Sequence, residues 1–135
     1  MKNNRFAVAI HILALASIQP GATSEFIASS VNTNPVVIRR ISSMLKKAGL
    51  LTSQAGIPGV TITKEPSAIS LLDIYKAVQR KEEITFAMHE NPNPKCVVGR
   101  SIQTALEKKF NAAQKAMENE LANQTLDDIL HDLFD

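Results

Sequence analysis

The sequence predicts a mainly helical protein in which short helices and one small two-stranded hairpin precede a long helix. Three observations support this fold class. Apolar residues recur with the 3.6-residue period of a helix in most segments, whereas an alternation with a period of two appears at residues 60–63. The apolar fraction of 44% and the charged fraction of 21% are those of a folded globular domain with a buried core.

Length and composition exclude several classes of protein. The 135 residues suffice for one domain with an appendage but not for two enzymatic domains. One cysteine cannot form a disulfide framework, and together with three histidines it leaves few ligands for a metal cage. With 4% aromatic residues and no tryptophan, the chain has few side chains on which single-stranded nucleic acid could stack. The expected compartment is the reducing cytoplasm.

Charge is unevenly divided along the chain. Residues 1–65 carry seven Lys or Arg against two Glu, a formal charge of +5, and the remaining residues carry eight basic against eleven acidic side chains, a charge of −3. We expect the basic first half of the chain to bind a polyanion, and the acidic second half to contact protein or solvent. Unevenly scattered surface charge is the alternative.

The apolar run at residues 6–18 predicts a helix that is buried on more than one side. Lys2 and Arg5 before it imitate the start of a secretory signal, but His11 interrupts the run and nothing downstream needs an oxidising compartment. The run has about 13 residues, fewer than the ~20 that cross a bilayer as a helix. We therefore expect a core helix and no membrane partner, with His11 as a core or interface residue rather than a metal ligand.

The next segment has the pattern of a helix, a tight turn and a second helix. Thr23 or Ser24 can cap a short helix that ends at Asn32, and Pro35 can open the following helix because its missing N–H is not needed there. This pattern is typical of a DNA-reading helix-turn-helix, and an ordinary helical hairpin with a solvated basic face is the alternative. The apolar side of the second helix is Val37, Ile38, Ile41, Met44, Leu45 and Ala48, and its polar side is Arg39, Arg40, Ser43, Lys46 and Lys47.

Residues 50–63 predict a β-hairpin directly after the basic helix. Residues 50–53 and 60–63 are the expected strands, and residues 54–59 between them are turn material. The order of helix, helix, basic helix and hairpin is that of a winged helix-turn-helix. In that fold the basic helix reads DNA and the hairpin, or wing, contacts DNA beside it.

The second half of the chain predicts a helix, an irregular loop, a long helix and a final short helix. Ser70 and Asp73 have capping-box spacing at the start of the first helix, and Thr125 and Asp128 have it at the start of the last. Residues 80–83 are charged, and residues 89–96, which contain two prolines, cannot form a regular helix, so residues 80–96 are expected to be a long irregular stretch. The expected apolar face of the last helix is Ile129, Leu130, Leu133 and Phe134.

The long helix predicts a partner helix. About 25 helical residues make a rod of ~37 Å, which is longer than a small domain needs for its own core. The chain thus divides into residues 1–80, a winged helix-turn-helix DNA-binding domain, and residues 81–135, which hold the loop, the long dimerisation helix and the final helix. Apolar residues recur every three or four positions, and the expected dimer seam is Ile102, Leu106, Phe110 and Met117.

Several stretches together resemble the Rrf2 family of bacterial transcription regulators. They are residues 23–31, Asn-Pro-Val-Val-Ile-Arg at 34–39, Leu-Lys-Lys-Ala-Gly-Leu at 45–50, and Ile-Ser-Leu-Leu-Asp-Ile-Tyr-Lys-Ala-Val at 69–78. Residues 93–103 and 121–128 are similar to the YwnA-like members, which lack a three-cysteine cluster site. The resemblance covers nearly the whole chain. It implies a homodimeric winged-helix protein, usually a repressor, whose long helices cross at the dimer interface.

The cysteine content departs from the cluster-binding members of the family. In those members the loop before the long helix carries three cysteines, whereas this chain has Cys96 alone, at the position of the last of the three. Clusters strongly favour several thiolates, so we expect no iron-sulfur cluster and no other cofactor. Cys96 precedes a helix and neighbours Lys95 and Arg100, which favour a thiolate and make it a candidate redox sensor. A small buried hydrophobe is the alternative.

The resemblance, carried onto matching positions, implies which residues contact a double-stranded DNA operator. Helix geometry leads to the same expectation, because the start of a recognition helix reaches base edges and basic residues further along neutralise phosphates. The wing has no arginine near its tip, which argues against minor-groove reading by an inserted arginine. The base-reading set is Asn34, Pro35, Val36, Arg39, Arg40 and Ser43, and the phosphate-contacting set is Thr23, Ser24, Lys46, Lys47, Gln54 and Gly56.

These observations predict a cytoplasmic, homodimeric transcriptional regulator that binds DNA. The alternative is a winged-helix module whose basic face binds an acidic protein without reading DNA sequence. Dispersed histidines, one cysteine and the lack of a glycine-rich phosphate loop give no basis for catalysis, so we do not expect an enzyme.

Overall fold

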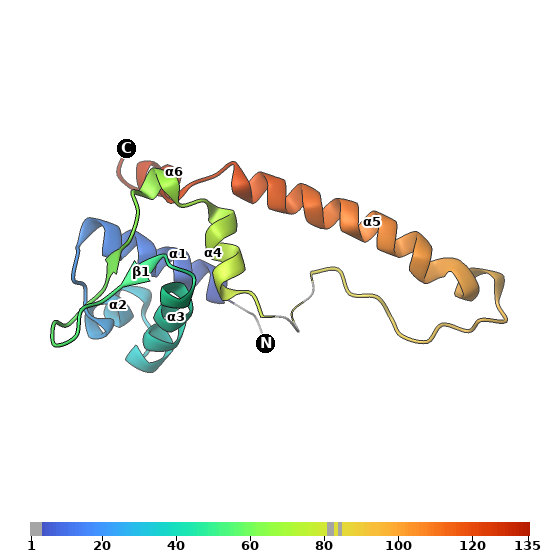
Figure 1. Ribbon diagram of the computed structural model, residues 1–135, viewed down its shortest axis with the longest axis horizontal. Helices are drawn as coiled ribbons and strands as arrows, with labels where there is room; N and C mark the ends of the chain where they lie inside the picture. The colour runs from blue at the N-terminus through green and yellow to red at the C-terminus, as the bar shows by residue number, and fades with distance from the viewer. Residues whose placement is uncertain (1–3, 81–82, 84) are drawn as a thin grey trace. The chain divides into compact units, whose positions relative to one another are not determined.

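The structure, a computed structural model, describes residues 4–80, 83 and 85–135 (Figure 1). The chain forms two compact units, Met1–Gln79 with Leu121–Asp135, and Arg80–Glu120. The mainly helical architecture with one small antiparallel sheet confirms the predicted fold class. In chain order the elements are α1 (Arg5–Ile18), α2 (Ser24–Val31), α3 (Pro35–Lys47), β1 (Leu51–Thr52), β2 (Thr61–Ile62), the 3-10 turn η1 (Pro66–Ala68), α4 (Leu71–Val78), α5 (Val97–Ala122) and α6 (Leu126–Phe134).

Local capping sets where four of the helices begin. In each case a side-chain oxygen before the helix accepts a hydrogen bond from the backbone N–H three residues later. Such a cap pairs a donor that the helix itself leaves free and contributes about 1 kcal/mol. Because each bond spans only three residues, these helix starts follow from the sequence. The pairs are Thr23 with Phe26 at 3.1 Å, Asn34 with Val37 at 3.1 Å, Ser70 with Asp73 at 3.0 Å, and Thr125 with Asp128 at 3.1 Å.

α1 lies at the centre of the first unit. It packs against α3, α4 and α6, and its residues Ile12 and Leu13 are completely buried. His11 is half-buried and shares a hydrogen bond of 2.9 Å between its Nε2 and Ser30 Oγ on α2. The structure therefore confirms a core helix that is covered on more than one side. In the part of the chain that the structure describes, no helix combines the length and apolar character needed to cross a membrane.

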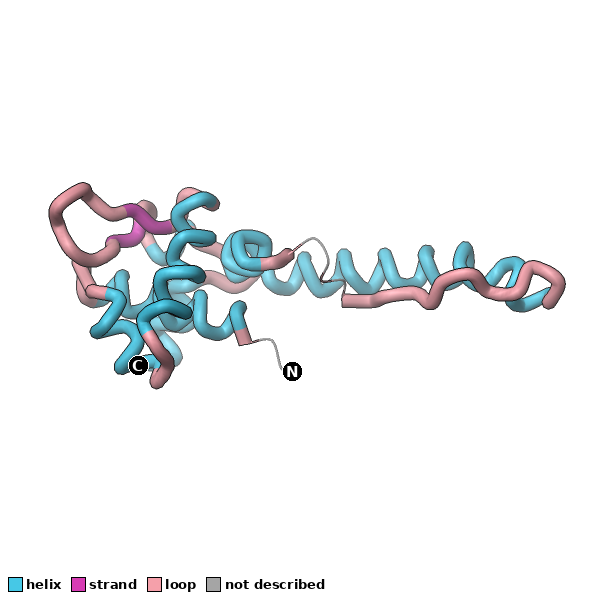
Figure 2. Tube along the Cα trace, turned by 90° about the horizontal axis from the view of Figure 1, so that it is seen from below, coloured by secondary structure: helices cyan, strands magenta, loops and turns pink. Residues whose placement is uncertain are grey.

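The base of the wing is attached to the turn between α1 and α2. Gly21 N–H donates to Val60 O at 2.9 Å, and Val60 N–H donates to Ala22 O at 3.0 Å. Gly59 has a φ of +96°, and a Cβ at this position would lie 2.0 Å from Gly21 O, so only glycine fits this contact. These contacts hold the wing beside the start of α2. The loop that joins the two strands extends beyond them, as Figure 2 shows.

α6 packs in the first unit, against α1 and η1. Leu126 N–H donates to Ile69 O at 2.9 Å, and the Leu126 side chain is completely buried. Fully burying a leucine contributes about 1.5–3 kcal/mol. The predicted division grouped this helix with the long helix in residues 81–135, whereas the structure places it with Met1–Gln79. The spacing of apolar residues shows that a helix has an apolar face but not which element covers it.

The expected apolar face of α6 is only partly correct. Ile129 and Leu130 pack against the core, but Leu133 and Phe134 are 61% and 64% exposed. Leu126, at the first position of the helix, supplies the fully buried contact instead.

In the second unit, the loop that precedes α5 in the sequence lies alongside the first half of this helix. The rings of Phe86 and Phe110 lie with their centroids 5.6 Å apart. A Cβ on Gly99 would lie 2.2 Å from the carbonyl oxygen of Asn93, so the loop backbone touches the helix there. The irregular conformation predicted for residues 80–96 is confirmed for those that the structure describes.

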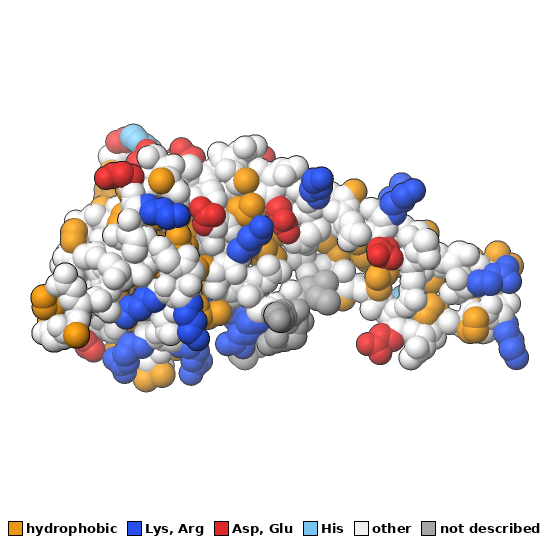
Figure 3. Space-filling model, viewed as in Figure 1, with side chains coloured by type: hydrophobic (Ala, Val, Ile, Leu, Met, Phe, Trp, Pro, Cys, Tyr) orange, Lys and Arg blue, Asp and Glu red, His pale blue; other side chains and the backbone are white. Residues whose placement is uncertain are grey.

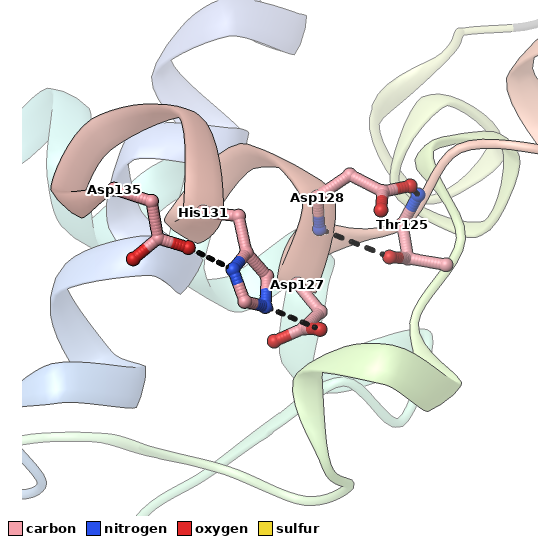
Figure 4. A network of polar contacts seen from close by, with 5 residues as sticks. All are labelled: Thr125, Asp127, Asp128, His131 and Asp135. Atoms are coloured by element: carbon pink, nitrogen blue, oxygen red, sulfur yellow. Dashed lines mark hydrogen bonds and ion pairs between the residues drawn. The ribbon is translucent and has the colours of Figure 1, made fainter.

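One histidine and two aspartates form a polar network on α6 (Figure 4). His131 Nε2 lies 3.3 Å from Asp127 Oδ2, and His131 Nδ1 contacts Asp135 Oδ2. The hydrogen bond and charge of Asp135, followed by the charge of Asp127, raise the pKa of His131 above its usual range. His131 also lies in the last turn of the helix, where the helix dipole favours a cation.

We expect protonation of His131 to stabilise α6. The folded-state pKa lies above the unfolded value of about 6.5, so the stabilisation is complete below about pH 6.5 and is lost as the pH rises through the raised pKa. Asp135→Asn should lower the pKa of His131, as followed by NMR titration of its imidazole, whereas Asp132→Asn on the same helix should change it less. An unaltered His131 pKa in Asp135→Asn would contradict the assignment.

Candidate nucleic-acid interface

α3 separates an apolar face from a polar one. Ile38, Ile41 and Leu45 are at most 4% exposed, whereas every predicted polar residue of the helix is exposed. Figure 3 shows Lys and Arg side chains gathered over the part of the first unit where Figure 1 places α3. The exposure agrees with the spacing of the apolar residues except at Ala48, which is exposed because it lies at the C-cap, beyond the last residue of the helix. Contact with DNA stays a prediction. The exposed residues are Arg39, Arg40, Ser43, Lys46 and Lys47.

The residues at the start of α3 are partly exposed, and one of them already makes a hydrogen bond within the protein. Val36 is 54% exposed, Pro35 is half-buried, and Asn34 is the N-cap. Asn34 Oδ1 accepts the hydrogen bond from Val37 N–H, so only the amide NH₂ of this side chain is free to donate to a base. Asn34 can thus recognise an acceptor on a base edge while still capping its helix.

Arg39 forms an ion pair within the first unit. Its Nη1 lies 3.5 Å from Glu25 Oε2 in the first turn of α2, and the two side chains are 56% and 70% exposed. Such an exposed pair contributes little to stability, typically below about 1 kcal/mol. The pair can therefore open when a stronger anion approaches Arg39.

The predicted phosphate-contacting residues lie on three elements of the first unit. Thr23 and Ser24 are half-buried at the start of α2, where Thr23 Oγ1 is used as the cap. Lys46 and Lys47 occupy the last turn of α3. Gln54 and Gly56 are exposed in the wing loop, and the neighbouring Ile57 is 59% exposed.

A pocket of about 280 Å³ brings some of these residues together between α2, α3 and the wing. We call it the wing pocket. Ser24, Arg39 and Lys46 line it, whereas Gln54, Gly56 and the start of α3 do not. Its full lining is Ser24, Arg39, Ser42, Lys46, Ser53, Ile57, Gly59 and Val60.

Ser42 is a wing-pocket residue that the sequence prediction missed. Ser42 is 5% exposed, whereas Ser43, which was predicted as a contact, is exposed. The spacing in the sequence does indicate that Ser42 is buried, because Ser42 lies four residues after Ile38 and three before Leu45, on the apolar side of the helix.

Cys96 is exposed at the start of α5. Its carbonyl accepts the first helical hydrogen bond, from Arg100 N–H at 2.9 Å, which makes it the N-cap residue. Backbone hydrogen bonds from Gly99 and then Val98 lower the pKa of the Cys96 thiol. Cys96 is therefore not a small buried hydrophobe, which was the alternative prediction. The two backbone hydrogen bonds stabilise its thiolate form.

The donors near Cys96 do not fit an iron-sulfur cluster. A cluster is held by several thiolates, and the chain contains one cysteine. Among the residues that the structure describes, no group of three or more His, Cys, Asp or Glu side chains could hold a metal ion.

The predicted dimer seam lies on α5. Ile102, Leu106, Phe110 and Met117 are each only half-buried, and no described residue of this 26-residue helix is fully buried. Val97 and Val98 at its start are 73% and 65% exposed. An apolar stripe of this length remains open to a partner.

Sequence comparison relates the chain to a family of transcriptional regulators. The profile of the Rrf2 family, described as iron-dependent transcriptional regulators, matches residues 2–132. YwnA of Bacillus subtilis (strain 168), provisionally named an HTH-type transcriptional regulator, is 59% identical over 134 residues, which cover 99% of this chain and 100% of YwnA.

Solved structures agree with this relationship. One that is provisionally described as a DNA-binding protein is 53% identical, has a TM-score of 0.79, and covers 93% of this chain and 98% of its own. A second, provisionally described as a transcriptional regulator from Lactobacillus plantarum, is 25% identical, has a TM-score of 0.81, and covers 96% of this chain and 89% of its own.

Proposed function

This chain belongs to the Rrf2 family of transcriptional regulators, and from that membership we propose that it is a homodimeric repressor that binds a double-stranded DNA operator. The family and the relative are regulators of transcription rather than enzymes. A protein that regulates transcription by binding DNA acts where bacterial DNA is, so we assign it to the cytoplasm. Repression is carried over from the family resemblance.

The observation that carries the proposal is the amphipathic recognition helix. α3 buries Ile38 and Leu45 in the core, so the orientation of its basic face is fixed by packing rather than by the flexible side chains themselves. Residues at the start of such a helix reach base edges in the major groove, and cations further along neutralise phosphates. We assign base contacts to Asn34, Pro35, Val36, Arg39, Arg40 and Ser43, and phosphate contacts to Thr23, Ser24, Lys46, Lys47, Gln54 and Gly56.

The half-buried seam of α5 supports the proposal of a dimer. An amphipathic helix of 26 residues without a fully buried side chain is stable when a second helix covers its apolar stripe. A two-fold dimer then presents two recognition helices to the DNA, and half-sites about 34 Å apart place both on one face of the duplex. The operator should therefore be pseudo-palindromic.

Selection of bound sequences from random DNA tests the proposal directly. A dimer that makes 6–10 phosphate contacts should lose about 10³ to 10⁵ in affinity between 50 and 200 mM salt. Selected sequences should share a pseudo-palindromic element. Binding that ignores DNA sequence, together with a flat salt response, would favour the alternative in which the basic face binds an acidic protein.

Cys96 supports a second role, a response to oxidants. The exposed thiol accepts backbone hydrogen bonds at the start of α5, and its lowered pKa increases the fraction of reactive thiolate near neutral pH. A peroxide would oxidise the thiolate to a sulfenic acid and release hydroxide. Because Cys96 begins the dimerisation helix, the added oxygen would disturb the start of the element that sets the distance between the two recognition helices.

We expect Cys96 to react with a thiol reagent with an apparent pKa below the ~8.5 of a free thiol. Peroxide should change the operator affinity of the wild type and leave that of Cys96→Ser unchanged. Equal affinity of both proteins before and after peroxide treatment would remove Cys96 from the regulatory mechanism without affecting the DNA-binding proposal.

A further inference from the structure

A second pocket of the first unit lies between the end of α3, the base of the wing and α4, and we call it the α4 pocket. It has a volume of about 260 Å³, and among the described residues that line it none was assigned to a DNA contact. Pockets that hold drug-sized ligands have about 300–1,000 Å³, so this one suits a smaller molecule. Its lining is Ala48, Leu50, Lys64, Asp73, Lys76 and Ala77.

Two lysines from different elements line the α4 pocket. Lys64 follows β2 and Lys76 lies on α4, and neither side chain makes an ion pair or hydrogen bond with a residue that the structure describes. Like charges that share a small space repel each other. A ligand carboxylate between the two lysines would remove this repulsion and accept a charge-assisted hydrogen bond from each of them.

Asp73 supplies the opposite charge in the same pocket. Its Oδ2 accepts a hydrogen bond of 3.0 Å from Ser70 N–H in the capping box of α4, which fixes the position of the carboxylate. Its Oδ1 accepts no hydrogen bond from any residue that the structure describes, so it can accept one from a ligand. A ligand that carried only a carboxylate would be repelled by Asp73, whereas a ligand that also carried an ammonium group would pair with it.

The rest of the lining is apolar, and backbone hydrogen bonds hold it in place. Ala48 is exposed and Ala77 is half-buried, so their methyl groups are accessible to a ligand. The carbonyl of Leu50 accepts a hydrogen bond of 3.2 Å from Thr63 N–H. Because Lys64 follows Thr63 directly, its backbone is held beside the end of α3. This preorganisation favours the binding of a small ligand.

We infer that the α4 pocket binds a small amino acid as an effector. The carboxylate of the amino acid pairs with Lys64 and Lys76, and its ammonium group pairs with Asp73. Its side chain contacts the methyl groups of Ala48 and Ala77. Phosphate and simple carboxylates share only the first of these interactions, and simple amines share only the second.

An amino acid in this pocket would act on the elements that are proposed to contact DNA. Ala48 is the C-cap of α3, Lys64 lies at the base of the wing, and α4 packs against α3 (Figure 1). A ligand that fits one arrangement of these elements better than another shifts the protein toward that arrangement. Binding of the amino acid does not depend on DNA, whereas its effect on operator affinity rests on the proposed function.

Titration of the full chain with each of the common L-amino acids, followed by NMR of the backbone amides, is the first test. A ligand should shift the amides of Ala48, Lys64 and Ala77. Loss of one hydrogen bond to a charged group weakens binding about 10- to 100-fold, which is the effect expected for Lys64→Gln and for Lys76→Gln. The exposed Lys109→Gln on α5 is the control and should bind as the wild type does.

Asp73→Asn tests which kind of ligand the pocket selects. The wild type should bind the best amino acid at least about tenfold more tightly than the matching carboxylic acid without its amino group. Asp73→Asn keeps an oxygen for the cap with Ser70, so it should fold, but it should lose this preference. If no amino acid shifts the pocket amides, or if the wild type binds the carboxylic acid as tightly as the amino acid, the inference is wrong.

A gel-shift titration with the same ligand tests the effector role. The amino acid should change the operator affinity of the wild type and of Lys109→Gln, and should change that of Lys76→Gln much less. Binding of the amino acid without any change in operator affinity would overturn the effector role. Selective DNA binding by the protein without ligand tests the proposed function separately, since it does not involve the α4 pocket.

Discussion

Replacing both Arg39 and Arg40 with glutamate should abolish selective binding to the operator. Each arginine that reads a base contributes about 1–3 kcal/mol, and a dimer loses every contact twice, so affinity should fall by about 10³-fold or more. Both side chains are exposed on α3 and neither packs in the core, so the variant should fold as the wild type does. Circular dichroism and the melting temperature check the fold, and a gel-shift titration measures affinity.

The matched control is Lys108→Glu with Lys109→Glu on α5. It changes the net charge by the same amount, and both positions are exposed outside the recognition helix. The control should retain operator binding apart from a small loss due to long-range charge. If the Arg39 and Arg40 variant still shifts its operator at 150 mM salt, α3 is not the recognition helix.

Glutamate in place of Leu106 should convert the dimer to a monomer. Leu106 lies in the half-buried stripe of α5, and a charge there would be buried without a partner if a second helix covered it. The wild type should have a mass of about 29 kDa in solution, twice the 14.7 kDa of one chain, and the variant should have the mass of one chain. Because two linked DNA-binding units bind far more tightly than one, operator affinity should fall by about 10²- to 10⁴-fold.

Ala105→Glu is the control for this experiment. It introduces the same side chain one residue away, at an exposed position outside the seam, and should leave both the mass and the DNA affinity unchanged. Light scattering at micromolar concentration measures the mass. A Leu106→Glu variant that remains a dimer, or a wild type that is monomeric with and without DNA, would contradict the proposed interface.

The helices and the polar face of α3 could be predicted because their determinants lie within a few residues of each other. Capping residues such as Asn34 and Ser70 bond to the backbone three residues later, and the proline at the start of α3 acts through its own ring. The period of apolar residues likewise reports which side of a helix is buried. Such local signals do not depend on where the rest of the chain lies.

The sequence by itself determined the order of the elements, the exposed basic face of α3 and the single thiol at the start of α5. Only the tertiary structure decided that α6 packs against α1, that the wing attaches to Gly21, and that Ser24, Ser42 and Ser53 line one pocket. The physical reason is that each of these contacts joins residues far apart in the sequence. A pattern of apolar residues indicates that one face of an element is buried. Which element packs against that face depends on the packing of the whole unit.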